Sequence, residues 1–69
     1  MKKITDYDRC YWIAVQNVAS FDLQADRQAV KALIRDAGFD RDTCLKLMEE
    51  NDFNAEIIHP VVDEMYPEK

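Results

Sequence analysis

The chain has 69 residues with a net charge of −5, and a chain this short has room for one hydrophobic core. A single glycine excludes a glycine-rich phosphate loop, two cysteines exclude a disulfide scaffold, and the longest apolar run is too short to span a bilayer. We therefore expect one cytoplasmic domain over residues 1–69, with short disordered ends at 1–4 and 67–69 and no membrane contact.

Charge divides the chain into two unlike halves. Residues 1–35 carry six basic and four acidic side chains, whereas residues 36–69 carry three basic and ten acidic ones. The halves therefore have net charges of +2 and −7. The second half is expected to repel nucleic acid and to attract basic surfaces.

A first helix is predicted from Asp6 to Ala19, because Thr5 and Asp8 have the spacing of a capping arrangement. Its apolar side chains form one stripe on a helical wheel: Tyr7, Cys10, Tyr11, Ala14 and Val18. Trp12 lies off this stripe. Either neighbours bury it on a second side of the helix, or it is an anchor for a partner.

The break at residues 20–22 predicts a second helix from Leu23 to Ala37, with Asp22 as its N-cap. Its predicted apolar face is Ala29, Val30, Leu33, Ile34 and Ala37. Three cations recur every four residues along it: Arg27, Lys31 and Arg35. Such a stripe can bind nucleic acid, but the acidic total favours pairing with acids of the same chain.

Gly38 follows the second helix where a left-handed cap is needed, and Asp40 is the expected N-cap of a third helix, Arg41 to Glu50. This helix is predicted to bury Cys44, Leu47 and Met48 and to expose Lys46, Glu49 and Glu50. Glu49, Glu50 and Asp52 crowd a helix C-terminus, where the macrodipole favours cations. Two interpretations stay open: such a local conflict is expected at a functional site, and it is also found on ordinary solvated charged faces.

A fourth helix is predicted from Asn54 to Tyr66, with Asn54 as its cap and Glu56 in its first turn. Pro60 interrupts this pattern because proline lacks the backbone donor. Two alternatives stay open: the helix kinks at His59, or residues 54–58 form a separate turn and Pro60 begins the last helix.

The pattern over residues 24–66 resembles the ubiquitin-associated (UBA) domain. It is carried by Leu33, Ile34, Ala37-Gly38-Phe39, Cys44, Leu45, Met48, Asn51, Asn54, Glu56, Ile57 and Ile58. The resemblance implies a three-helix core that grips ubiquitin or a translation-factor partner through the Gly38-Phe39 loop and the last helix. It departs from the family at Ala37, where a methionine usually helps to grip ubiquitin, and at Pro60.

Catalytic and metal-binding patterns are missing from the sequence. Both cysteines, Cys10 and Cys44, are expected to be small buried hydrophobic residues. His59 is the only histidine and has no second strong ligand near it in the sequence. We therefore expect neither an enzyme nor a cofactor.

These observations predict an all-α bundle of three to four helices, a UBA-like core with an extra N-terminal helix, that binds a protein partner. The expected binding residues are an acidic face and three apolar anchors: Asp40, Asp42, Glu49, Glu50, Asp52, Glu56, and Trp12, Phe39, Phe53.

The most concrete form of this function is a small inhibitor, of the phage or mobile-element type, that covers a basic surface of a nucleic-acid-handling protein. The UBA-like adaptor is the alternative. A homodimer is also open, because the first helix is apolar over too much of its surface for a small monomer.

Overall fold

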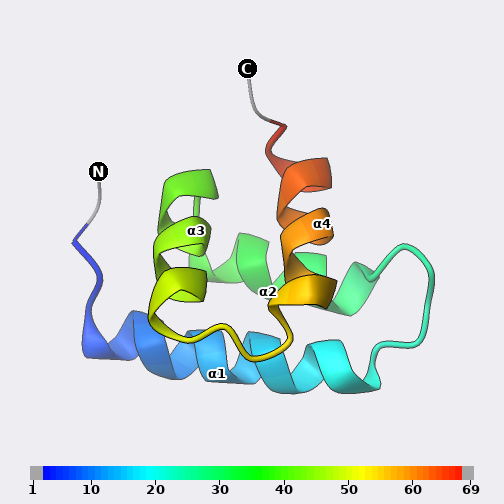
Figure 1. The fold of residues 1–69 in the computed structure, drawn as a ribbon, viewed down its shortest axis with the longest axis horizontal. Helices are drawn as coiled ribbons and strands as arrows, with labels where there is room; N and C mark the ends of the chain where they lie inside the picture. The colour runs from blue at the N-terminus through cyan, green and yellow to red at the C-terminus, as the bar shows by residue number, and fades with distance from the viewer. Residues whose placement is uncertain (1–2, 68–69) are drawn as a thin grey trace.

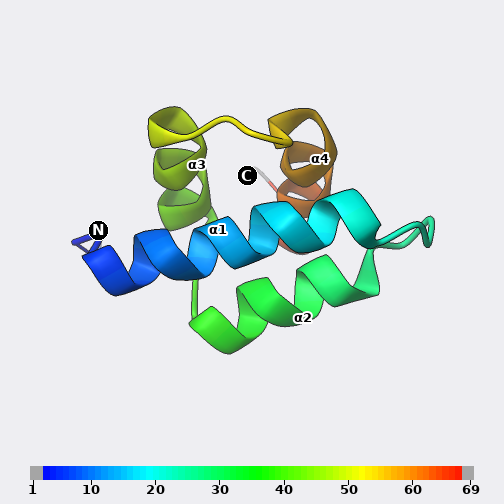
Figure 2. The same cartoon turned by 90° about the horizontal axis from the view of Figure 1, so that it is seen from below.

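Four helices build the molecule, in two layers. A computed structural model describes residues 3–67, with α1 at Asp6–Phe21, α2 at Gln28–Ala37, α3 at Arg41–Glu50 and α4 at Ala55–Met65. Figure 1 shows α3 and α4 standing side by side on a layer formed by α1 and α2, which lie alongside one another in Figure 2. No strand occurs in the described part of the chain, and the expected all-α class is confirmed.

The start of α1 is the predicted capping box. Thr5 Oγ1 accepts a hydrogen bond from the Asp8 backbone N–H at 3.2 Å, and Asp8 Oδ2 accepts one from the Thr5 N–H at 3.0 Å. These two bonds satisfy N–H groups that have no partner inside the helix. The helix runs through Phe21, two residues beyond its expected end.

The predicted apolar stripe of α1 is only partly buried: Tyr11 and Val18 pack against the core, but the centre of the buried face lies elsewhere. Tyr7 is 73% exposed and Cys10 is exposed, whereas the buried apolar side chains of α1 are Trp12, Val15 and Ala19. Residues 10–21 include no charged side chain, so periodicity alone leaves α1 with more than one candidate face. The bulky indole of Trp12 enters the core and decides between them.

The second helix begins five residues later than predicted. Asp22 does not occupy the N-cap position, which is Arg27. Its N–H donates to the Val18 carbonyl oxygen at the end of α1, and its carboxylate accepts from the Gln24 N–H at 3.3 Å and from the Val30 N–H in the first turn of α2 at 3.5 Å. Arg27 precedes α2 in the left-handed conformation, with φ 53°, and its guanidinium donates to the Asp22 carbonyl oxygen. Leu23 is 90% exposed, so nothing draws residues 23–27 into a helix packed on the core.

The joint between α2 and α3 agrees with the prediction. Gly38 has φ 74°, which places it in the left-handed region, and Asp40 Oδ1 accepts from the Thr43 N–H at 2.8 Å. α3 has the expected bounds. Between these caps the ring of Phe39 enters the core, where its centroid lies 6.1 Å from that of Trp12 and 5.9 Å from that of Tyr11.

The core joins residues of all four helices and the α2–α3 joint. Its buried apolar members are Trp12, Val15, Ala19, Val30, Ile34, Phe39, Cys44, Leu47, Met48, Ile58, Val61 and Val62. The ends at 1–4 and 67–69 were expected to be disordered. Ile4 packs against this cluster, and residues 1–2 and 68–69 lie outside the described residues. Among the helices described, none is long and apolar enough to cross a membrane.

One continuous helix runs through Pro60, so of the two alternatives for residues 54–60 the separate turn does not form. The ring is exposed to solvent rather than packed in the core. Asn54 occupies the N-cap position in the left-handed conformation, with φ 60°, but its side chain makes no capping bond. The side-chain amide of Asn54 instead donates hydrogen bonds to Gln16 and Ser20 of α1, and these bonds hold the α3–α4 loop.

Candidate partner-binding site at the end of α3

A run of exposed acidic side chains ends α3 and continues into the loop before α4; we call residues 49–54 the acidic loop. Glu49, Glu50 and Asp52 are exposed, and Phe53 beside them is 54% exposed. The last turn of α3 has no basic side chain. Since the free carbonyl groups at a helix C-terminus already carry partial negative charge, one end of α3 is strongly negative, as the sequence predicted.

Hydrogen bonds from α1 hold the acidic loop in place. Gln16 is buried, and its Nε2 donates to the Asn51 carbonyl oxygen at 3.0 Å. Asn54 Nδ2 donates to the Gln16 carbonyl oxygen at 2.8 Å and to Ser20 Oγ at 2.6 Å. The loop is therefore positioned before any partner arrives, which lowers the entropy lost on binding.

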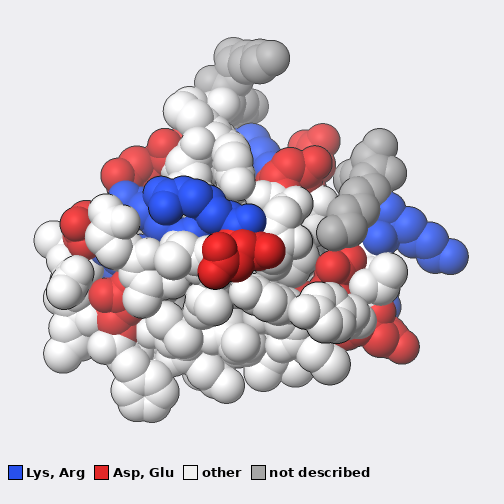
Figure 3. All heavy atoms as spheres, turned by 180° about the vertical axis from the view of Figure 1, so that it is seen from behind, with Lys and Arg blue, Asp and Glu red and all other residues white. Residues whose placement is uncertain are grey.

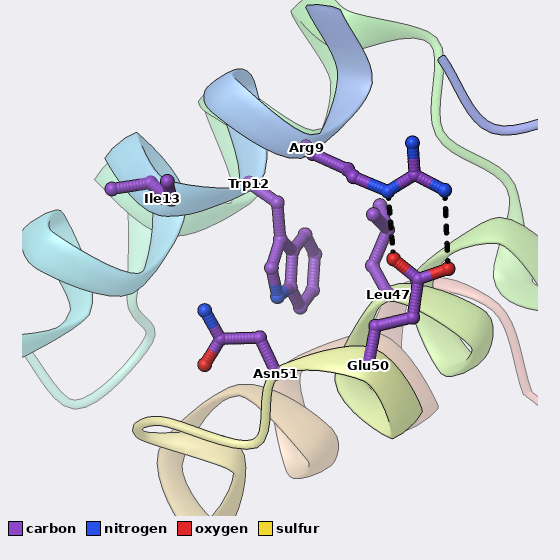
Figure 4. A pocket seen from close by; sticks show the side chains of 6 residues that line it. All are labelled: Arg9, Trp12, Ile13, Leu47, Glu50 and Asn51. Carbon is purple, nitrogen blue, oxygen red and sulfur yellow. Dashed lines mark hydrogen bonds and ion pairs between the residues drawn. The ribbon is translucent and has the colours of Figure 1, made fainter. Parts of the chain in front are cut away.

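A pocket of about 260 Å³ lies beside the acidic loop, between α1 and α3 (Figure 4). Its lining residues are Arg9, Trp12, Ile13, Leu47, Glu50 and Asn51. The indole Nε1 of Trp12 is buried and has no hydrogen-bond partner among the described residues, and Figure 4 shows it on the edge of the ring that faces Asn51. The pocket is thus lined mainly by apolar surface, and the buried indole N–H of Trp12 is left without a hydrogen bond beside it.

An ion pair forms one edge of this pocket. Arg9 Nε lies 2.9 Å from Glu50 Oε1, and Arg9 Nη2 lies 3.4 Å from Glu50 Oε2 (Figure 4, dashed lines). The hydrogen bond and the charge of Arg9 hold the pKa of Glu50 below its usual range, and those of Glu50 raise the pKa of Arg9. Glu50 therefore stays ionised at neutral pH. Both side chains are partly exposed, so the pair adds little to stability.

Half of the acidic groups on α3 and α4 already have a partner within the chain. Asp40 caps α3, and the Thr43 N–H lowers the pKa of its carboxyl. Asp63 pairs with Arg41 at 2.8 Å, and the nearly buried Lys31 pairs with Glu64 at 2.7 Å. The predicted pairing of Lys31 with an acid of its own chain is confirmed.

Figure 3 shows basic and acidic side chains next to one another on the face opposite to that of Figure 1. Four exposed acids of the predicted acidic face make no ion pair with any described residue: Asp42, Glu49, Asp52 and Glu56. Among the described residues no ion pair neutralises these four carboxylates, and Asp52 directly precedes Phe53 in the sequence.

Two of the three predicted anchors are core residues. Trp12 and Phe39 are each 1% exposed, so neither ring is available to a partner in this structure. Their burial follows from their contact with each other in the centre of the bundle. Of the three, Phe53 alone lies on the surface, in the loop between α3 and α4, where its N–H donates to Asn51 Oδ1 at 3.3 Å.

The sequence analysis missed the residues that hold and line this site: Arg9, Gln16, Ser20 and Leu47. The side chains on α1 act on groups more than thirty positions away, such as Arg9 on Glu50, 41 residues later. Spacing within a helix gives no signal for such pairs. A buried glutamine on an otherwise apolar face requires a hydrogen-bond partner, but the sequence does not say which.

The two thiols lie in unlike environments, and the expectation that both are buried was wrong for Cys10. Cys10 is exposed on the outer face of α1, whereas burial of Cys44 raises the pKa of its thiol to about 12. His59 lies at the surface with its Nδ1 3.2 Å from Asp63. Within residues 3–67, no three acidic, histidine or cysteine side chains are placed to hold a metal ion.

Comparison with protein-family models, with curated proteins and with solved structures returns no match for this chain.

Proposed function

We propose that the protein is a non-catalytic interaction module that binds a basic surface of a protein partner through its acidic loop. The partner's cations meet Glu49 and Asp52, and Phe53 enters an apolar depression on the partner. The most concrete form is an inhibitor that covers the basic surface with which a nucleic-acid-handling protein holds its ligand. Asp42, in the first turn of α3, and Glu56, in the first turn of α4, add to the negative charge of this part of the chain.

One observation carries the proposal: an exposed aromatic ring stands among unpaired carboxylates at the negative end of a helix. Burying the exposed part of Phe53 is worth roughly 1 kcal/mol, since a fully buried side chain of this size contributes about 1.5–3 kcal/mol. The carboxylates add long-range attraction, which raises the association rate and fixes orientation. The hydrogen bonds from α1 keep ring and charges in one arrangement.

Charge supports the basic partner in particular. The chain has a net charge of −5, and residues 36–69, which supply the acidic loop, account for −7 against +2 in residues 1–35. Proteins that bind nucleic acid present basic surfaces to phosphates. A compact acidic module competes for such a surface without any chemistry of its own.

The test is capture from a lysate of the source organism with the tagged protein, at about 50 and about 500 mM salt, where the screening length falls from about 14 Å to about 4 Å. We expect a partner with a basic surface that is held at low salt and released at high salt. Asp52→Lys should abolish its capture, and Phe53→Ser should weaken it at both salt concentrations.

Asp36→Lys is the matched control, because Asp36 is an exposed acid on α2, away from the acidic loop, and the charge change is the same. Capture that survives Asp52→Lys but is lost with Asp36→Lys would place the contact elsewhere. A partner retained at both salt concentrations would refute the electrostatic proposal and indicate an apolar contact.

A further inference from the structure

The pocket between α1 and α3 has the size of a single side chain. Its volume of about 260 Å³ lies below the range of about 300–1,000 Å³ that holds a drug-sized ligand. Trp12 and Leu47, each 1% exposed, form its floor, and the exposed side chains of Ile13, Glu50 and Asn51 stand at its rim (Figure 4). A partner's side chain that enters it therefore meets an apolar wall and a carboxylate together.

One guanidinium serves two carboxylates at the edge of this pocket. Arg9 Nη1 lies 3.0 Å from Asp6 Oδ1, and Arg9 Nε lies 2.9 Å from Glu50 Oε1. The other cation near Glu50 is Lys46, which is exposed one turn earlier on α3 and makes no ion pair within residues 3–67. The acidic loop adds two carboxylates without an ion pair. Carboxylates thus outnumber cations around the pocket, which favours a cationic occupant.

Glu50 has room for a second guanidinium. An ionised carboxylate has about four lone-pair positions, and Arg9 uses two of them. The Glu50 side chain is 36% exposed, so a donor can reach it from solvent. A guanidinium matches the two oxygens of a carboxylate better than an ammonium does. It is also more weakly hydrated, so it loses less hydration beside an apolar wall.

We propose that the pocket receives an arginine side chain of the basic partner, with its alkyl stem against Ile13 and its guanidinium hydrogen-bonded to Glu50. This inference rests on the proposed function and names the side chain that the partner inserts. Glu50 and Asn51 belong both to the pocket and to the acidic loop, so a partner that covers the loop also covers the pocket. Arginine is among the residue types that contribute most to the affinity of protein interfaces.

The test is an NMR titration of the isotope-labelled full chain with the peptide acetyl-glycyl-arginyl-glycinamide. Trp12 is the only tryptophan, so its indole N–H gives a single signal beside the pocket. We expect this signal and the backbone N–H signals of Ile13 and Glu50 to shift, with a dissociation constant of about 1–10 mM for a ligand this small. The peptide with citrulline, which has a similar shape without the charge, should bind about tenfold more weakly, and the lysine peptide about threefold more weakly.

Two substitutions test the two parts of the contact. Glu50→Gln removes the carboxylate and should weaken the arginine peptide about tenfold, and Ile13→Ser removes the apolar wall and should weaken it about threefold. Asp36→Asn is the matched control for Glu50→Gln, because it removes the same charge from an exposed position on α2 that does not line the pocket. It should leave the dissociation constant unchanged. Circular dichroism of the three variants checks that they fold.

Several results would overturn the proposal. Equal affinity of the arginine and citrulline peptides would exclude the charge, and equal affinity of the arginine and lysine peptides would exclude the guanidinium. Equal effects of Glu50→Gln and Asp36→Asn, or no shift of the Trp12 signal at about 50 mM peptide, would place the arginine elsewhere. Capture of the partner is tested at Asp52 and Phe53, which do not line the pocket, so it can succeed where the titration fails.

Discussion

Asn54 stabilises the acidic loop in two ways that substitution can separate. Its side chain donates to the Gln16 carbonyl oxygen and to Ser20 Oγ, and its backbone has φ 60° and ψ 19°. Asn54→Gly removes both hydrogen bonds and keeps an easy left-handed backbone. Asn54→Ala removes the same bonds and also places a Cβ in that conformation.

The two substitutions should differ measurably in their cost. A hydrogen bond contributes about 0.5–1.5 kcal/mol net, and one of these two is exposed, so Asn54→Gly should lower the free energy of unfolding by about 1–2 kcal/mol. The left-handed backbone adds about 1 kcal/mol for alanine, which gives about 2–3 kcal/mol for Asn54→Ala. A domain of this size has roughly 3–5 kcal/mol in all, so both losses are large.

Urea unfolding followed by tryptophan fluorescence measures both values, because Trp12 is the only tryptophan and is 1% exposed in the folded state. Gln24→Ala, at an exposed position between α1 and α2, is the control and should change stability by less than about 0.5 kcal/mol. Equal stability of the glycine and alanine variants would refute the backbone contribution. An Asn54→Gly variant as stable as the unmodified chain would show that the side-chain bonds do not hold the loop.

Two further predictions concern charge. The Thr43 N–H lowers the pKa of Asp40 from 3.8. The stabilisation that the ionised carboxylate gives to the folded state is therefore complete well above pH 3.8 and is lost as the pH falls through the folded-state pKa. Asp40→Asn keeps the cap without titrating; it should cost about 0.3–1 kcal/mol at pH 7 and nothing in strong acid, as urea unfolding at each pH will show. At the second site, Lys31→Met should change stability by less than about 1 kcal/mol, whereas Glu64→Ala, which leaves the nearly buried ammonium unpaired, should cost more in the same assay. A larger loss of stability for Lys31→Met than for Glu64→Ala would contradict this prediction.

Features that depend on neighbouring residues could be predicted from the sequence. Thr5 and Asp8 begin α1, Gly38 ends α2, and Asp40 begins α3, each through bonds that span at most a few positions. The negative end of α3 was predicted for the same reason, since residues 49–52 are adjacent. In all these cases the partner groups lie within one helical turn, so spacing alone determines the contact.

The tertiary structure alone decided which face of α1 is buried, where α2 begins and what holds the acidic loop. The sequence favoured the Tyr7 face, but the core is built on Trp12 and Phe39, which meet only when α1 packs against the joint after α2. Likewise, Gln16 and Asn54 are 38 residues apart and become partners only in the folded chain. An uncharged helix has no local signal that distinguishes its inner from its outer face, because burial depends on which surfaces the rest of the chain brings to it.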